Sequence, residues 1–175
     1  MQKDNNHWQP SLEIDDLHAL QPWIRHTGSF IDRLAEHGII PSIHVLREDW
    51  IKPEIWESKL LGLGSHELAL VREVRIGNDD QIWLYGRTVI QKAMLTNKNE
   101  LLHLENRSLG SVLFQDPEIK RDKLEFIYAE PSTLWPGFSP TNASWIRRSL
   151  FHLHDASLLL TEIFMPDLTT LCMKN

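Results

Sequence analysis

The chain has 175 residues, of which 42% are apolar and 24% are charged, and its formal net charge at pH 7 is −6. These values are typical of one globular domain with a sizeable core, and the acidic balance argues against general nucleic-acid binding, which needs a basic surface. The only cysteine, Cys172, excludes an intramolecular disulfide and suits a reducing compartment.

The N-terminal stretch "MQKDNNHWQP" is polar and does not resemble a secretory signal. No window of the sequence approaches the roughly 20 uninterrupted apolar residues that a membrane helix needs. We therefore expect a cytoplasmic protein without a membrane span. We expect a single domain over residues 1–175, with the first ~6 residues frayed.

Two segments have the pattern of helices. The first, "SFIDRLAEHG", begins with Ser29 as its N-cap and ends at Gly38. The second, "NKNELLHLENRSLGSVLF" (97–114), is expected to form two helical pieces, with Ser108 capping the later one.

The rest of the chain has the alternation and residue types of strands. The candidates are residues 42–48, 67–76, 81–91, 123–129, 145–153 and 157–165. The segments "GNDD" (77–80) and "HDA" (154–156) are expected to close hairpins. The Pro-containing run at 130–142 is expected to be a loop long enough to cover a site. The expected architecture is α+β, with a roughly six-stranded antiparallel sheet and helices packed on it.

Two of these strands each place one charge on an otherwise apolar face. Because side chains alternate along a strand, Arg72 is the only charge on its face of "ELALVREVRI". Glu162 is likewise alone on its face of "SLLLTEIFM". One explanation is a buried Arg72–Glu162 salt bridge with no further role. The other is a closed pocket in which each ion meets a different end of a small ligand, and alternation alone does not choose between them.

The segment "RSLG" (107–110) adds weight to the pocket. At the start of the expected later helical piece, the amides of Leu109, Gly110 and Ser111 would have no partner within the helix. Such amides bind anions, and together with an arginine fork they suit a carboxylate. Taken alone, an ordinary N-cap with nothing bound is the simpler interpretation.

Other polar residues are weaker candidates. His152 and His154 share a face at a spacing that can bind metal, but no carboxylate or cysteine cluster accompanies them. Arg147 and Arg148 point to opposite faces of their strand, so at most one faces the pocket. Arg87 is expected to be a strand residue with a structural partner.

Seven motifs together resemble the bacterial chorismate pyruvate-lyases of ubiquinone biosynthesis, and they occur in that family's order. They are "TGSF" (27–30), "VLREDW" (45–50), "LVREV" (70–74), "LYGRTVI" (84–90), "SLGSVLF" (108–114), "WIRRSLF" (145–151) and "LLLTEIFMP" (158–166). The resemblance implies an antiparallel sheet with helices on it and an internal ligand cavity under two flaps. It also implies conversion of chorismate to 4-hydroxybenzoate and pyruvate without metal or organic cofactor.

The resemblance further implies the site residues. Arg72 would hold the ring carboxylate, and the backbone of Leu109 would donate to the same carboxylate. Glu162 would meet the 4-hydroxyl group, and would either assist proton movement near C4 or only orient the ring. Phe30 would line the site and contribute through its main chain, at a position where the family more often has methionine or leucine. Arg72 and Glu162 are thus the expected catalytic residues.

A closed apolar cavity also implies slow release of 4-hydroxybenzoate and product inhibition. We expect a monomer with no nucleic-acid partner.

Two alternatives to the lyase stay open. One is a non-enzymatic sensor, because the effector-binding domains of a group of winged-helix repressors resemble this fold; a repressor, however, would also carry a basic DNA-binding domain. The other is a metal enzyme that uses His152 and His154.

Overall fold

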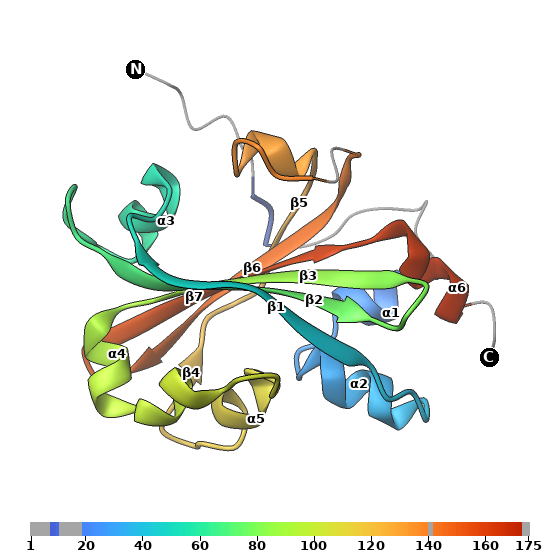
Figure 1. Cartoon of the computed structure of the whole chain (residues 1–175), viewed down its shortest axis with the longest axis horizontal. Coiled ribbons are helices and arrows are strands. Elements are labelled where there is room, and N and C mark those ends of the chain that lie inside the picture. The colour runs from blue at the N-terminus through green and yellow to red at the C-terminus, as the bar shows by residue number, and fades with distance from the viewer. Residues whose placement is uncertain (1–7, 11–18, 140–141, 173–175) are drawn as a thin grey trace.

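A computed structural model describes residues 8–10, 19–139 and 142–172. The expectation that the first ~6 residues are frayed lies outside these ranges. Within them, the chain forms an α+β domain in which short helices and loops cover both faces of one antiparallel sheet (Figure 1). No helix of the described residues is long and apolar enough to cross a membrane.

The sheet contains seven strands in the described part of the chain, paired in the order β1-β2-β3-β7-β6-β4, with β5 on the same edge of β6 as β4. Their bounds are β1 (Ser42–Ile51), β2 (Ala69–Gly77), β3 (Ile82–Ile90), β4 (Lys120–Arg121), β5 (Glu125–Ala129), β6 (Ser144–Leu153) and β7 (Ala156–Phe164). All of the predicted strands are confirmed, with small differences at their ends. The short strand β4 is not among the predicted ones.

Both predicted hairpins are confirmed. In the β2–β3 turn, the side-chain Oδ1 of Asn78 accepts hydrogen bonds from the backbone N–H groups of Asp80 at 3.0 Å and Gln81 at 2.8 Å. In the β6–β7 turn, His154 has a φ of 57°, the left-handed conformation that tight turns between twisted strands favour. These turns set the register of the β2–β3 and β6–β7 pairs.

Helices and 3-10 turns occupy the connections. They are α1 (Gln21–Ile24), α2 (Phe30–Glu36), α3 (Ile55–Leu60), α4 (Lys92–Asn97), η1 (Asn99–His103), α5 (Gly110–Leu113), η2 (Pro131–Thr133), η3 (Pro166–Leu168) and α6 (Thr169–Cys172). The first predicted helix is confirmed as α2. Its predicted N-cap is confirmed too, because the Oγ of Ser29 accepts a hydrogen bond from the Asp32 N–H at 3.3 Å. The second predicted segment contains two helical pieces, η1 and α5.

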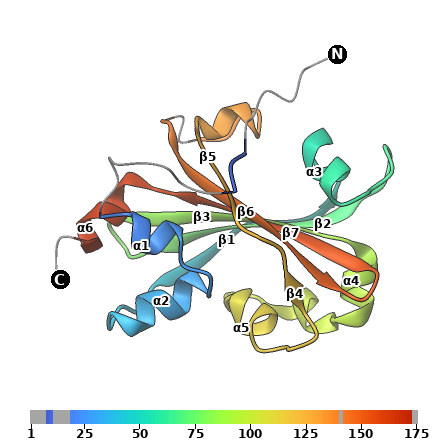
Figure 2. The ribbon, with the colours of Figure 1, turned by 180° about the vertical axis from the view of Figure 1, so that it is seen from behind.

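The helices divide between the two faces of the sheet. α1, α2, α4 and α5 lie on one face, whereas α3 and the loop after β5 lie on the other (Figures 1 and 2). Buried apolar side chains fill the space beneath each group. In the loop after β5, Leu134 and Trp135 pack against Ile146 and Ile163, so this part of the loop covers the face opposite α2 and α5.

Candidate active site

A pocket lies between the sheet and two covering segments, residues 28–31 at the start of α2 and residues 107–110 at the start of α5. Strands β2, β3 and β7 supply most of the sheet side. The pocket is lined by all four predicted site residues, Phe30, Arg72, Leu109 and Glu162. The described part of the predicted 130–142 loop, with Leu134, Trp135 and Phe138, lies on the other face, so the expectation that this loop covers a site is wrong for this pocket.

The strand register explains how the two inward charges reach one pocket. Arg72 on β2 lies opposite Thr88 on β3, and Gly86 on β3 lies opposite Glu162 on β7. Because side chains alternate, these four residues share one face. A Cβ at Gly86 would lie 3.1 Å from a methyl group of Val74, so a larger residue at this pocket-lining position would crowd Val74. The charges therefore lie diagonally across β3 and are not cross-strand partners.

Arg72 is 3% exposed and is oriented by protein groups on one side of the pocket. Its Nη1 donates to Glu48 Oε2 at 2.6 Å, and its Nη2 donates to the carbonyl oxygens of Glu105 at 2.7 Å and Arg107 at 3.4 Å. Three of the five guanidinium N–H groups make these bonds. The Nε–H and one Nη1–H have no partner among the described residues, so the fixed guanidinium retains donors for a ligand.

Glu162 is also buried, and its partner is Arg147 on the neighbouring strand β6. The Nε and Nη2 of Arg147 donate to the two carboxylate oxygens at 2.6 and 3.0 Å. Burial alone would raise the pKa of the Glu162 carboxyl, but Arg147 outweighs it and the pKa lies below its usual value. The Arg72–Glu162 salt bridge considered above is therefore wrong, because each charge has its own partner. Arg148 points to the opposite face, as alternation predicts, and pairs with Glu125.

The start of α5 offers fewer free amides than the sequence suggests. The Gly110 N–H donates to Ser108 Oγ at 3.1 Å, and the Ser111 N–H donates to the Ser108 carbonyl at 3.1 Å. The expectation of three free amides is wrong for these two. The Leu109 N–H donates to no described residue, so it is the one amide of the three that remains for a ligand.

The two covering segments meet at Gly110 and Ser29. A Cβ at Gly110 would lie 2.6 Å from Ser29 Oγ and 2.7 Å from Ser29 Cβ, which is closer than close-packed atoms allow. Next to Ser29, the ring of Phe30 is buried and packs edge-on against Phe164, with ring centroids 6.1 Å apart. Closure of the pocket therefore depends on a backbone approach that a glycine permits.

Arg121 also lines the pocket, although no sequence pattern points to it. It lies on β4, where its Nε donates to Ser149 Oγ at 2.8 Å and its Nη1 donates to the Thr27 carbonyl at 2.6 Å. Burial lowers the pKa of Arg121 to about 10, while Glu162 acts against this shift and Arg147 acts with it. The side chain is therefore still a cation at neutral pH.

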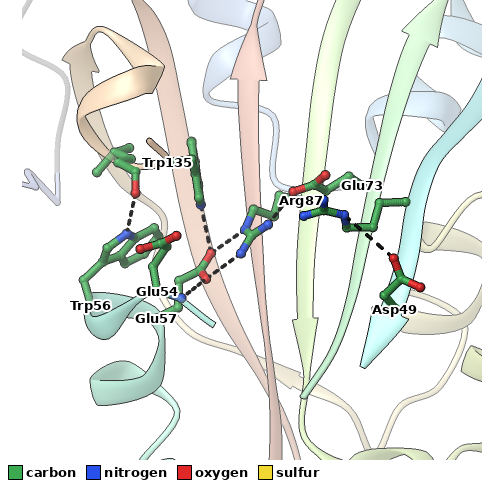
Figure 3. Close-up of polar contacts among 9 residues, drawn as sticks. Asp49, Glu54, Trp56, Glu57, Glu73, Arg87 and Trp135 are labelled. Carbon is green, nitrogen blue, oxygen red and sulfur yellow. Dashed lines mark hydrogen bonds and ion pairs between the residues drawn. The ribbon is translucent and has the colours of Figure 1, made fainter. Parts of the chain in front are cut away.

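Arg87 belongs to a separate polar network on the opposite face (Figure 3). Its Nε and Nη2 donate to the two carboxylate oxygens of Glu57 on α3, at 2.7 and 2.8 Å, and its Nη1 contacts Glu73. The indole N–H of Trp135 donates to Glu57 at 3.0 Å. The predicted structural partner of Arg87 is thus confirmed, and the network joins α3 and the loop after β5 to the sheet.

The two histidines singled out by their spacing have separate surroundings. The ring nitrogens of His152 lie 2.8 Å from Ser157 Oγ and 3.0 Å from an Asp122 carboxylate oxygen, whereas His154 sits in the β6–β7 turn. Among the residues that the structure describes, no group of three or more His, Cys, Asp or Glu side chains could hold a metal ion.

Comparison with known sequences gives a family. The family model described as chorismate lyase matches residues 2–173. A probable chorismate pyruvate-lyase of Coxiella burnetii is 39% identical over 171 residues, which cover 92% of this chain and 92% of that protein. A chorismate pyruvate-lyase of Hamiltonella defensa is 30% identical over 166 residues, which cover 94% of this chain and 88% of that protein.

Comparison with solved structures gives the fold. The effector domain of PhnF from Mycobacterium smegmatis aligns with a TM-score of 0.55 at 11% identity, covering 80% of this chain and 90% of that chain. The ligand-binding domain of a putative GntR-family transcriptional regulator from Bordetella bronchiseptica aligns with a TM-score of 0.50 at 11% identity, covering 73% and 84%. At these identities the likeness shows the fold alone.

Proposed function

The chain belongs to the chorismate lyase family, and from this premise we propose that it converts chorismate to 4-hydroxybenzoate and pyruvate in the pocket under the two covering segments. Arg72 and the Leu109 amide bind the ring carboxylate, Glu162 meets the 4-hydroxyl group, and Phe30 lines the part of the pocket that holds the ring. The observation that carries this proposal is that these four residues, taken from four separate stretches of sequence, line one pocket.

Chorismate needs little chemical help to react. The C3–O bond to the enolpyruvyl group breaks and the hydrogen at C4 leaves as a proton, which makes the ring aromatic. The released enolpyruvate takes up a proton and becomes pyruvate, so the two products account for every atom of the substrate. The protein's task is to hold the reactive conformer and exclude water. A covered pocket with one fixed group at each end suits that task.

The surroundings of Glu162 favour an orienting role over proton transfer. Arg147 holds the pKa of its carboxyl below the usual value, and a carboxylate that is hard to protonate is a weak base. Each carboxylate oxygen accepts one hydrogen bond from Arg147 and has a further lone pair. Glu162 therefore accepts a hydrogen bond from the 4-hydroxyl group and sets the position of C4.

The same closure gives a second proposal, that 4-hydroxybenzoate leaves slowly and inhibits the enzyme. The flat product keeps the ring carboxylate and the 4-hydroxyl group, which are the two groups that Arg72 and Glu162 bind. Both residues are buried, so release requires the covering segments to separate. Added 4-hydroxybenzoate should lower steady-state turnover, and unchanged turnover would refute this proposal.

We also propose a cytoplasmic monomer that binds no nucleic acid. The acidic charge and the single cysteine support this, as does a pocket that draws every proposed ligand-binding residue from one chain. Cell fractionation and sedimentation of the purified protein test location and oligomeric state.

The main experiment follows both products together. Purified protein is added to chorismate, and pyruvate and 4-hydroxybenzoate are measured over time. Equal amounts of both products support the lyase. Binding of 4-hydroxybenzoate without formation of either product would support the sensor instead. A parallel measurement in chelator separates the lyase from a metal enzyme that uses His152 and His154.

A further inference from the structure

The pocket contains a half-buried cation, Arg121, that differs from its neighbours in having no carboxylate partner. Arg72 pairs with Glu48, and Arg147, beside the pocket, pairs with Glu162. The hydrogen-bond acceptors of Arg121, by contrast, are a hydroxyl and a carbonyl oxygen. No carboxylate of the described residues lies within ion-pair distance of it. Even partial burial of a cation without a counterion costs free energy, so this position favours an anionic ligand.

The guanidinium of Arg121 is fixed but not saturated. The bonds to Ser149 and Thr27 use two of its five N–H groups, and the other three have no acceptor among the described residues. Its plane is also set by aromatic neighbours, because the guanidinium carbon lies 5.0 Å from the ring centroid of Phe151 and 5.5 Å from that of Phe114. A rigid fork with free donors is a good carboxylate ligand.

Arg121 lies toward the Glu162 end of the pocket and away from Arg72. Its partner Ser149 is two residues from Arg147 on β6, directly opposite Leu160 on β7, and Glu162 is close enough to influence the pKa of Arg121. Glu162 is proposed to meet the 4-hydroxyl group. The neighbouring ring carbon, C3, carries the enolpyruvyl ether, which bears the second carboxylate of chorismate.

We propose that Arg121 binds the carboxylate of the enolpyruvyl group, and thereby selects the dicarboxylate substrate over the monocarboxylate product. This inference rests on the proposed function, because it takes the ring to be held between Arg72 and Glu162. It gives the pocket three polar anchors for the three polar substituents of chorismate. The first anchor binds the ring carboxylate, the second the 4-hydroxyl group, and Arg121 the side-chain carboxylate.

The position of Arg121 also suits binding of the enolpyruvyl group, which is the part of the substrate that leaves as pyruvate. Arg121 and Phe114 line both the covered pocket and an outer depression bordered by Arg25, Thr27 and Lys123. The two residues therefore separate the ring site from a surface with two further positive side chains, Arg25 and Lys123, and one carboxylate, Asp122. An enolpyruvyl group held at Arg121 lies on the side from which pyruvate can leave before the ring product does.

Besides Arg72 and Arg121, Arg107 is the third cation that lines the pocket, and it is the rival ligand for this carboxylate. It is exposed, its side chain donates to the His103 carbonyl at 2.7 Å, and its own carbonyl accepts from Arg72. It therefore lies at the ring-carboxylate end. Arg107→Met is the matched control for Arg121→Met, because both remove one lining guanidinium.

The decisive comparison is between substrate and product in the same variants. Arg121→Met should lower kcat/KM for chorismate about 10- to 100-fold, because it removes charge-assisted hydrogen bonds, and should change the Kd of 4-hydroxybenzoate less than about twofold. Arg121→Lys should recover part of the loss. Ser149→Ala, which removes a hydrogen bond to Arg121 but keeps its charge, should have a smaller effect than Arg121→Met. Arg107→Met should not change kcat/KM for chorismate relative to the affinity for 4-hydroxybenzoate.

A second measurement uses the unmodified protein, so it does not depend on the variants folding. 3-(Carboxymethoxy)-4-hydroxybenzoate keeps both carboxylates on a stable ring, and its side-chain amide is a neutral analogue of similar shape. The parent should bind the acid more tightly than the amide, and Arg121→Met should lose this preference. Equal binding of the two by the parent, an equal loss of substrate and product affinity in Arg121→Met, or a selective loss in Arg107→Met would each overturn the inference. If chorismate is not converted at all, the acid-over-amide preference still decides on Arg121 separately from the proposed function.

Discussion

Arg147 and Glu162 face each other across β6 and β7 and are joined by two parallel hydrogen bonds of 2.6 and 3.0 Å. The remaining nitrogen of Arg147, Nη1, donates to the Ile24 carbonyl at 2.9 Å and the His26 carbonyl at 2.7 Å. Arg147 therefore ties the carboxylate to the chain that leads into α2, the first covering segment. Because Arg147 is 1% exposed, removing Glu162 would leave a buried charge without a counterion.

Glu162→Gln should lower the free energy of unfolding by about 3–5 kcal/mol at neutral pH, because it leaves Arg147 unpaired. The folded pKa of Glu162 lies below its ordinary value of 4.5. The ionised carboxylate thus stabilises the fold above about that pH, and this contribution is lost as the pH falls through the folded pKa. The difference in unfolding free energy between parent and variant should therefore shrink on acidification, as measured by urea denaturation at a series of pH values.

Glu118→Gln is the control for this pH series. Glu118 is exposed, so its substitution should change the free energy of unfolding by less than about 0.5 kcal/mol at neutral pH. If the difference between parent and Glu162→Gln stays constant down to about pH 3, the carboxylate does not have the depressed pKa that its pairing with Arg147 implies.

Strand alternation is sufficient to place Arg72 and Glu162 on the pocket face, because side-chain direction along a strand follows from residue order. Their partners cannot be read in the same way. Glu48 is 24 residues from Arg72 in the chain, and Arg147 meets Glu162 only because the β6–β7 turn fixes the register. Alternation thus predicts which charges are buried and leaves open what neutralises them.

The role of Arg121 and the face covered by the loop after β5 could not be predicted from sequence patterns. Arg121 lies on a strand of two residues, too short for any period to appear. The loop is placed by contacts such as Trp135 with Glu57, which are 78 residues apart, and no local signal indicates the face it covers. Likewise, no local signal indicates that Ser108 Oγ accepts a hydrogen bond from the Gly110 amide, which the sequence suggests is free.

Arg72→Met should weaken the binding of chorismate and 4-hydroxybenzoate alike, because both carry the ring carboxylate. Losing a charge-assisted hydrogen bond costs about 1.5–3 kcal/mol, which raises the Kd of either ligand about 10- to 150-fold. Calorimetric titration measures the product, and initial rates measure the substrate. Arg75→Met, on the exposed face of the same strand, should leave both unchanged. Product affinity in Arg72→Met equal to that of the parent would exclude Arg72 as the carboxylate ligand.

Gly110→Ala should hold the two covering segments apart, because the new Cβ would meet the Oγ and Cβ of Ser29 at 2.6 and 2.7 Å. Overpacking of this kind costs about 1–3 kcal/mol, and here it acts on the closed state. The release rate of 4-hydroxybenzoate should rise about 5- to 150-fold, which stopped-flow displacement measures. Gly64→Ala, where the nearest atom to the new Cβ is 3.7 Å away, is the control. Unchanged release in Gly110→Ala would mean that the closed contact does not limit product departure.

Glu57→Gln should destabilise the fold without changing the ligand preferences of the pocket. Glu57 is fully buried, receives two hydrogen bonds from Arg87 and one from Trp135, and lies on the face opposite the pocket (Figure 3). Removing its charge leaves the buried guanidinium underpaired, so the free energy of unfolding should fall by about 3–5 kcal/mol. Asp49→Asn is the contrast, because the Arg47–Asp49 pair is exposed with atoms 3.8 Å apart, and its loss should cost less than about 1 kcal/mol.

Urea midpoints of the two variants give the stability difference, and the Kd of 4-hydroxybenzoate measured below the unfolding transition gives the effect on the pocket. The Glu57 network joins α3 and the loop after β5 to the sheet, whereas the pocket is closed by α2 and α5 on the other face. The folded fraction of Glu57→Gln should therefore bind product as the parent does. A large loss of product affinity in the folded variant would mean that the two faces are coupled through β3, which carries Arg87 on one face and Gly86 and Thr88 on the other.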